Sequence, residues 1–316
     1  MDTVPVLFRQ SVAACLTEPD DDAKINSYVF SDPLWTQAIQ TEWRNRHNLW
    51  VFLCEKDDSS WEYTLIKIRG DKQPVDVGSV ESVFKESDVK FGRIRSILIK
   101  GKKYEMRLQK VLEDGSVLST VSFEAFMKMA SSMLPAPGRN FPNLNIYGHL
   151  DEATQRTIVK YVAHIDFVGL RFDNYTPTYD PILEKHLKSE KMRNNCNLTG
   201  SIFASSTLAL IRSHFQRVSV LGQLEIHNPT NPFSFADFET MFDALLKMPV
   251  TNEQVGNRSI FVKANFETNA IEQLRNFRRD LACSATECFH WLKSIENKIF
   301  IEVVVSQNHH WEIRLV

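Results

Sequence analysis

The chain has 316 residues, of which 43% are hydrophobic and 24% are charged, close to the averages of folded globular proteins. With only 11 glycines and 12 prolines it is not a collagen-like, elastic or broadly disordered chain. The net charge of −2 is far from the strongly basic balance of a dedicated nucleic-acid-binding protein, so nucleic acid is not the expected partner.

Neither a membrane segment nor a secretion signal is evident. No stretch reaches the roughly 20 apolar residues that a membrane helix requires, and the N-terminus lacks the basic and apolar regions of a signal peptide. The five cysteines are scattered, which favours reduced thiols over a disulfide framework. We therefore expect a cytoplasmic or nuclear protein with no membrane partner.

Residues 1–45 predict a small helical unit. Apolar residues recur every four positions on one face of a first helix, with Pro5 in its first turn. These residues are Val4, Phe8, Val12 and Leu16. Asp32-Pro33 is a typical helix start, and Trp35, Ile39 and Trp43 follow it at helical spacing. We expect Phe8, Val12, Trp35 and Ile39 to be buried against one another.

Residues 46–134 predict an antiparallel β-rich region. Three hairpins are expected from aromatic and branched runs that flank short polar turns. Their strands are 49–53 with 61–66, 93–99 with 104–108, and 111–112 with 117–123. A short helix is expected at 80–86 and another at 126–133, ended by Pro135-Ala136-Pro137-Gly138.

Residues 139–316 predict repeated β-α units. Strand-like runs are followed by helix-like stretches at intervals of roughly 20 to 40 residues, which is typical of parallel strands with helices on one side. The strands are expected at 144–147, 164–172, 197–198, 218–226 and 259–266, and the helices at 151–161, 181–192, 206–215, 235–246 and 269–281. A hairpin of 299–305 with 311–316 closes the module. The predicted fold class is therefore α+β to α/β, with irregular, leucine-rich-repeat-like units.

One segment is strongly basic. Between Lys90 and Lys110, eight lysines and arginines face a single acid, Glu105. Such a ribbon is either a solvated edge that discourages strand pairing or a site for an acidic partner. In the second case Arg93, Arg95, Lys102 and Lys103 are the expected contacts.

No enzyme signature is present. The phosphate-binding loop, the dinucleotide fingerprint, the hydrolase elbow and the paired-histidine zinc helix are all missing. Cys283, Cys288 and His290 come nearest to a metal cluster, but their spacing differs from the usual zinc pattern and no fourth ligand is evident nearby. Phe289 and Trp291 alternate with His290 as in a packed segment. The sequence thus predicts no enzyme, no catalytic or cofactor-binding residue, no cofactor and no metal ligand.

The combination resembles an expanded nematode family of F-box-like proteins. The resemblance rests on Met1-Asp2-Thr3-Val4-Pro5 with Phe8 and Val12, the helix from Trp35 to Trp43, the strand Trp61-Glu62-Tyr63 and the later β-α units. Residues 1–45 are similar to a degenerate F-box, whose Leu-Pro opening, apolar stripe and tryptophan correspond to Val4-Pro5, Phe8 to Leu16, and Trp35 or Trp43. The resemblance implies that this unit docks a Skp1-type adaptor and that the C-terminal module holds a substrate protein.

Two interaction roles follow from these observations. In the first, the protein is a substrate-recruiting adaptor of a ubiquitin ligase, with Val4, Pro5, Phe8, Val12 and Trp35 in the adaptor contact. In the second, the helices only pack on the β region, and the basic ribbon or the repeat face binds an acidic protein or nucleic acid. An enzyme of unfamiliar type ranks third.

Overall fold

The structure is a computed structural model of the whole chain. It describes residues 6–15, 33–56, 59–69, 73–78, 92–102, 119–120, 122–134, 142–189, 196–200, 203–216, 223–227, 230–247, 261–277, 282–285, 288–294, 299–306 and 310–315. In these ranges, every helix is too short or too polar to cross a bilayer.

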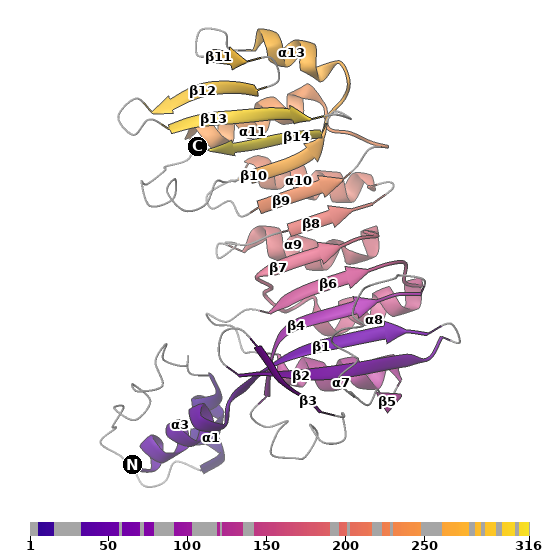
Figure 1. Cartoon of the computed structure of the whole chain (residues 1–316), viewed down its shortest axis with the longest axis vertical. Coiled ribbons are helices and arrows are strands. Elements are labelled where there is room, and N and C mark those ends of the chain that lie inside the picture. The colour runs from indigo at the N-terminus through magenta and orange to yellow at the C-terminus, as the bar shows by residue number, and fades with distance from the viewer. Residues whose placement is uncertain are drawn as a thin grey trace. The chain divides into compact units, whose positions relative to one another are not determined.

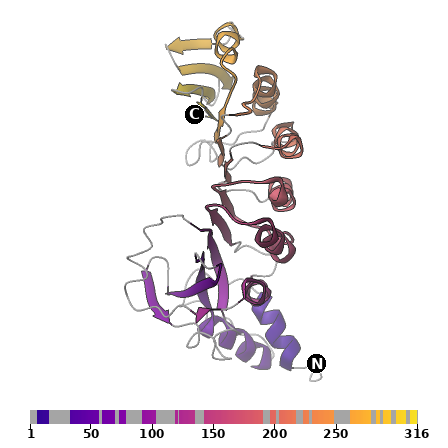
Figure 2. The ribbon, with the colours of Figure 1, turned by 90° about the vertical axis from the view of Figure 1, so that its right-hand side faces the viewer.

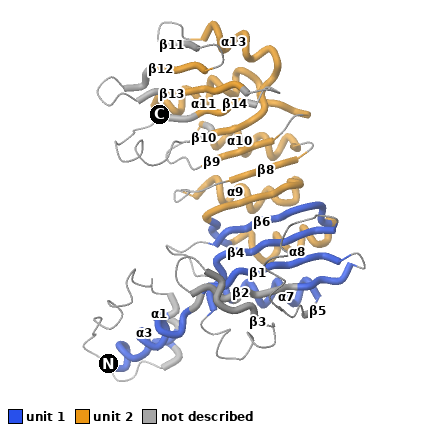
Figure 3. Tube along the Cα trace, in the orientation of Figure 1, with its two compact units in different colours: residues 1–150, 165–167 blue, residues 151–164, 168–316 orange. Residues whose placement is uncertain are grey.

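The chain forms two compact units. The first comprises residues 1–150 and 165–167, and the second comprises residues 151–164 and 168–316 (Figure 3). Each unit combines helices with a sheet, which confirms the general α/β character of the prediction.

The first unit begins with two helices and continues into a sheet with one further helix. Its helices are α1 (Val6–Cys15), α3 (Pro33–Asn45) and α7 (Phe123–Met133). Its strands are β1 (His47–Glu55), β2 (Trp61–Arg69), β3 (Gln73–Gly78), β4 (Gly92–Lys100), β5 (Ser119–Thr120) and β6 (Asn143–Tyr147). β1 and β2 pair antiparallel, which confirms the first predicted hairpin. α7 ends at Met133, which is the end expected for the helix at 126–133.

The predicted antiparallel character of the 46–134 region is wrong for β4. This strand lies between β1 and β6 and runs parallel to both, so the sheet of the first unit is mixed. The physical reason lies in its side chains, because Ile97, Leu98 and Ile99 are buried in succession. A strand that buries side chains on both faces suits the centre of a sheet. Three predicted segments lie outside the described residues. They are the helix at 80–86, the strand at 104–108 that was expected to pair with 93–99, and the strand at 111–112 of the third hairpin.

The division between the units also differs from the prediction. It falls after Leu150, although residues 135–138 were expected to separate two modules. The reason is that β6 pairs along its whole length with β4, so residues 143–147 belong with the strands of the first unit. The Pro135–Gly138 segment itself lies outside the described residues.

The second unit alternates strands and helices. Its helices are α8 (Glu152–Val162), η1 (Pro177–Tyr179), α9 (Asp180–Lys188), α10 (Ser205–Gln216), α11 (Phe235–Lys247) and α13 (Ala270–Asn276). Its first four strands are β7 (Gly169–Phe172), β8 (Cys196–Thr199), β9 (Gln223–His227) and β10 (Phe261–Asn265). These strands pair in parallel, as the β-α alternation predicted (Figure 1).

The two faces of this parallel array differ in character. The helices stack along one face (Figure 2), where Phe172, Leu198 and Ile226 are buried. The other face carries a polar row that runs straight across the strands in register. Its members are Arg171, Asn197, Glu225 and Lys263. Within the row Asn197 Nδ2 donates to Glu225 Oε2 at 2.9 Å, and Lys263 Nζ lies 3.4 Å from Glu225 Oε1.

Polar side chains join successive helices of the second unit. Asp180 at the start of α9 accepts hydrogen bonds from Tyr175 Oη at 2.8 Å and from Thr207 Oγ1 of α10 at 2.7 Å. Asp237 in the first turn of α11 accepts from the Ser234 N–H at 3.0 Å and from Arg212 Nε of α10 at 2.7 Å. Partial burial acts to raise the pKa of Asp237, but the hydrogen bonds from Arg212 and Ser234 outweigh it and hold the pKa below its ordinary value.

Four antiparallel strands close the second unit. They are β11 (Ala282–Ala285), β12 (Cys288–Ser294), β13 (Ile299–Ser306) and β14 (His310–Leu315). β13 and β14 form the expected closing hairpin, and β14 pairs antiparallel with β10. Phe238 of α11 packs edge-on to Trp311, with ring centroids 5.5 Å apart, and contacts Trp291 at 6.3 Å. The closing strands thus share an aromatic core with the array.

Candidate functional site

The N-terminal helices have a small core of their own. Ala13 of α1 packs with Ile39 and Trp43 of α3, all three nearly inaccessible to solvent, and Trp35 packs against this cluster while remaining partly exposed. Ile39 and Trp43 lie one and two turns beyond Trp35, as the helical spacing predicted.

The expectation that Phe8 and Val12 are buried is wrong for Phe8 and holds only in part for Val12. Phe8 is 55% exposed and Val12 is half-buried. The helix buries Arg9 and Ala13, which lie four residues apart, so the face that packs on α3 is rotated by one residue from the apolar stripe. Phe8 nevertheless meets Trp35 edge-on, with ring centroids 6.3 Å apart.

An apolar surface therefore lies on this pair of helices. We call Phe8, Leu34 and Trp35 the aromatic ledge. Leu34 is 49% exposed and stands next to Trp35 in the first turn of α3. Large side chains of this kind on a surface are typical of binding sites. Val4 and Pro5, the other predicted contacts, lie outside the described residues.

The ledge stands on helices that are tied to the sheet by a buried carboxylate. Glu42 of α3, whose side chain is only 5% exposed, accepts a hydrogen bond from Arg93 Nη2 of β4 at 2.7 Å. Its Oε1 atom also accepts from Arg46 Nε and Nη2 at 3.2 and 3.1 Å. Arg46 Nη2 donates in turn to the Ala13 carbonyl of α1 at 3.1 Å. One carboxylate and two guanidinium groups thus join α1, α3 and β4.

The basic ribbon is not a row of free cations. Arg93 is taken up by Glu42, Arg95 Nε donates to Asn48 Oδ1 at 2.7 Å, and Lys102 Nζ donates to Ser59 Oγ at 2.6 Å. Lys103 lies outside the described residues. Three of the four cations proposed for an acidic partner are therefore engaged with side chains of their own chain.

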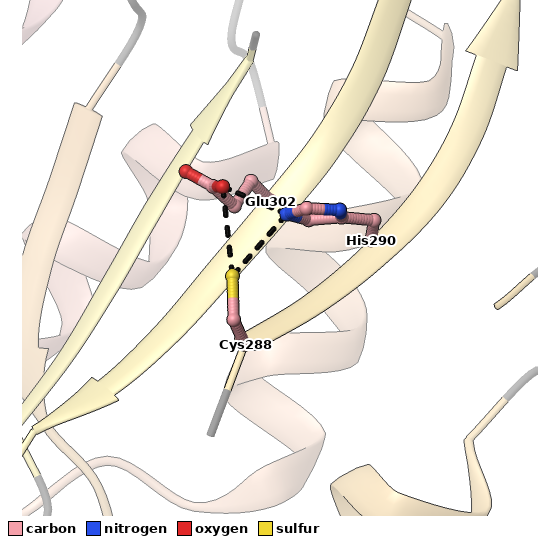
Figure 4. A group of neighbouring side chains, drawn as sticks. All are labelled: Cys288, His290 and Glu302. Carbon is pink, nitrogen blue, oxygen red and sulfur yellow. Dashed lines mark hydrogen bonds and ion pairs between the residues drawn. The ribbon is translucent and has the colours of Figure 1, made fainter. Parts of the chain in front are cut away.

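A second cluster lies on the closing strands. Cys288 and His290 of β12 meet Glu302 of β13, with all three side chains directed toward one point (Figure 4). His290 Nε2 lies 2.7 Å from Glu302 Oε1 and 3.2 Å from Cys288 Sγ, and the sulfur lies 3.5 Å from the same carboxylate oxygen. Glu302 is buried, and the other two are half-buried. We call these residues the Cys-His-Glu cluster.

The sequence pattern accounts for part of this cluster. Phe289 and Trp291 are buried and stack on each other, and their alternation with Cys288 and His290 turns the latter two to the opposite face of the strand. Glu302 was not foreseen, because it comes close through the register of the β12–β13 pair, in which it lies directly opposite His290. A hairpin drawn around the polar Glu296-Asn297-Lys298 segment would have found it.

The geometry does not suit nucleophilic catalysis. A nucleophile, a histidine and an orienting carboxylate form a relay when the two partners contact different ring nitrogens. Here the sulfur and the carboxylate oxygen both lie against Nε2 of His290. Three ligand atoms that converge on one point are instead the arrangement that chelates a cation.

The other described thiols lie in different surroundings. Cys196 is completely buried, and desolvation raises the pKa of its thiol to about 12. Burial also raises the pKa of Cys54, against the opposing effects of Lys100 and Lys56. Neither belongs to a group of three metal-ligand residues, and among the described residues only the Cys-His-Glu cluster forms such a group.

Comparison with known proteins adds no relative, since no protein-family model, no curated protein and no solved structure matches the chain.

Proposed function

We propose that this chain is a non-enzymatic protein-interaction protein that recruits a substrate to a ubiquitin ligase. The helical unit of residues 1–45 would dock a Skp1-type adaptor, and the β-α array of the second unit would hold the target protein. The observation that carries the proposal is the aromatic ledge, a half-exposed Phe8 set edge-on against Trp35 beside an exposed Leu34.

The ledge has the composition and the support of a docking surface. Aromatic anchors dominate the energy of protein interfaces because they bury a large apolar area at a small cost in side-chain entropy. The Glu42 network and the Ala13–Ile39–Trp43 cluster fix the helices beneath it, so little ordering is required on binding. An adaptor with an apolar groove would cover Phe8 and Leu34 together.

The second unit supplies a face for a target. We propose that its units are leucine-rich-repeat-like, with the helices on one side and a row of polar side chains on the other. Arrays of this type bind partners through such extended faces. The row of Arg171, Asn197, Glu225 and Lys263 mixes both charge signs, which suits a protein surface better than a phosphate backbone.

Binding of purified full-length variants to a purified Skp1-type adaptor, measured by calorimetry, tests the proposal. Phe8→Ala and Leu34→Ala should each weaken binding by about tenfold or more, since an interface anchor is worth more than about 1 kcal/mol. Gln37→Ala, at an exposed position on α3, is the matched control and should bind as wild type does. Absence of saturable wild-type binding, or equal affinity of all three variants, would reject the adaptor role.

The alternative, an acidic protein or nucleic acid bound by the basic ribbon at residues 90–110, has less support. Arg93, Arg95 and Lys102 already have partners within the chain, and a ligand would have to displace them. If that alternative holds, partner binding will fall steeply with added salt and will be insensitive to Phe8→Ala.

A further inference from the structure

We infer that the Cys-His-Glu cluster is a zinc-binding site on the closing sheet of the second unit. The inference is independent of the proposed adaptor role, since it concerns other residues in the other unit. It rests on three different ligand types that converge from two adjacent strands.

The chemistry of the three groups favours zinc. Thiolate, imidazole and carboxylate are the side chains that bind Zn²⁺, whereas Mg²⁺ and Ca²⁺ take oxygen ligands almost exclusively. Glu302 is 8% exposed, so its charge is largely withdrawn from water. A dication held by Glu302 and by the thiolate of Cys288 would balance both negative charges in a position where water cannot solvate them.

The distances between the ligand atoms fit a tetrahedral ion. Bonds of about 2.3 Å to sulfur and about 2.0 to 2.1 Å to nitrogen and oxygen at tetrahedral angles place the ligand atoms roughly 3.3 to 3.6 Å apart. The sulfur lies 3.5 Å from Glu302 Oε1 and 3.2 Å from His290 Nε2, close to these values. The remaining edge, from His290 Nε2 to Glu302 Oε1, is 2.7 Å and would open by about half an ångström.

The backbone holds these groups in place without the ion. His290 and Glu302 are register partners, and Cys288 lies two residues before His290 on the same strand face. The packed aromatic side chains of Phe289 and Trp291 fix the opposite face of β12. Within the described residues the cluster supplies three ligands for a tetrahedral zinc ion, and the His290 side chain is 39% exposed.

The test is metal binding by the full-length chain after removal of metal with a chelator. Zn²⁺ affinity is measured by competition with a chromogenic chelator, and Co²⁺ serves as a spectroscopic substitute because a thiolate ligand gives it an intense near-ultraviolet charge-transfer band. We expect one equivalent of Zn²⁺ per chain and this band in the wild type. Cys288→Ser should abolish the band, and His290→Gln and Glu302→Gln should each weaken affinity by at least about tenfold.

His227→Gln is the matched control. His227 Nε2 lies 3.0 Å from Glu225 Oε1, so this is a second histidine–carboxylate pair on the same sheet. In the part of the chain that the structure describes, it belongs to no group of three metal-ligand residues. The variant should bind Zn²⁺ as tightly as wild type. Absence of saturable Zn²⁺ binding, a Co²⁺ complex without the thiolate band, or equal losses in the control and the cluster variants would each overturn the inference. These readouts on wild type do not depend on the folding of any variant.

Discussion

Replacing Glu42 by glutamine tests how the N-terminal helices are held on the first sheet. Both Arg46 and Arg93 donate to the same oxygen of Glu42, and the side chains of the three residues are 6%, 14% and 5% exposed in the order Arg46, Arg93, Glu42. Removing one partner of a buried ion pair costs about 3–5 kcal/mol, because the remaining charge stays buried. Glutamine keeps one hydrogen-bond acceptor, so we expect Glu42→Gln to lower the free energy of unfolding by about 2–4 kcal/mol.

A double-mutant cycle isolates the pair. Arg93→Met should also destabilise, and the double variant should lose less than the two single changes together, with a coupling energy of at least about 1 kcal/mol. Urea unfolding followed by tryptophan fluorescence is suitable, since Trp43 lies next to Glu42 in the buried cluster. Glu152→Gln is the control, because its ion pair with Arg156 is exposed and should be worth no more than about 0.5 kcal/mol.

If Glu42→Gln and Arg93→Met are both as stable as wild type, the claim that the Glu42 network stabilises the fold is refuted. Binding of an acidic partner by Arg93 would then cost little stability, and the basic ribbon would again be a candidate binding surface. Because Arg93 was first singled out as a partner contact, the cycle decides between an internal and an external role for the same guanidinium.

Three further predictions concern residues of the two units. Phe238→Ala should cost about 3–5 kcal/mol in urea unfolding, since this fully buried ring contacts Trp311 and other aromatic side chains, and a loss under 1 kcal/mol would contradict the shared core. Asp237→Asn should cost about 1–2 kcal/mol at pH 7. Because the folded-state pKa of Asp237 is depressed, that contribution is present above the ordinary value of 3.8 and is lost as the pH falls below it, so the gap to wild type should shrink near pH 3 in the same assay and a constant gap would argue against this origin. Gly101→Ala should lower the free energy of unfolding by about 1–3 kcal/mol because the added Cβ would collide with the backbone of His149. A variant that melts at the same temperature as wild type would show that the backbone can move apart at no cost.

The elements that sequence predicted well are those with strong local signals. The β1–β2 hairpin follows from two aromatic, branched runs around a polar turn, and the parallel array follows from the repeated alternation of apolar strands and amphipathic helices. The neighbours of β4 do not follow, because sheet order is decided by long-range packing. β11 and β12 were missed as strands for a related reason, since neither is a continuous branched or aromatic run.

The candidate sites divide in the same way. Trp35 was recognised from its helical spacing, but the exposure of Phe8 was not, because apolar periodicity cannot reveal that Arg9 occupies the buried face. Cys288 and His290 were noticed from their proximity in the sequence. Glu302 became their neighbour only through strand register, which depends on the turn that connects β12 and β13.

The antiparallel partner of β10 has a consequence for biosynthesis. Residues 261–265 pair with 310–314, so one edge of β10 has no partner while the intervening chain is still being translated. During that interval the nascent array presents a row of unsatisfied peptide groups that any extended segment can join. The β14 strand of another copy that has not yet paired with its own β10 could take this place, since it has the same sequence and so matches the register. Crowded polysomes are thus where strand exchange between copies would begin, and slow translation after residue 265 would increase it.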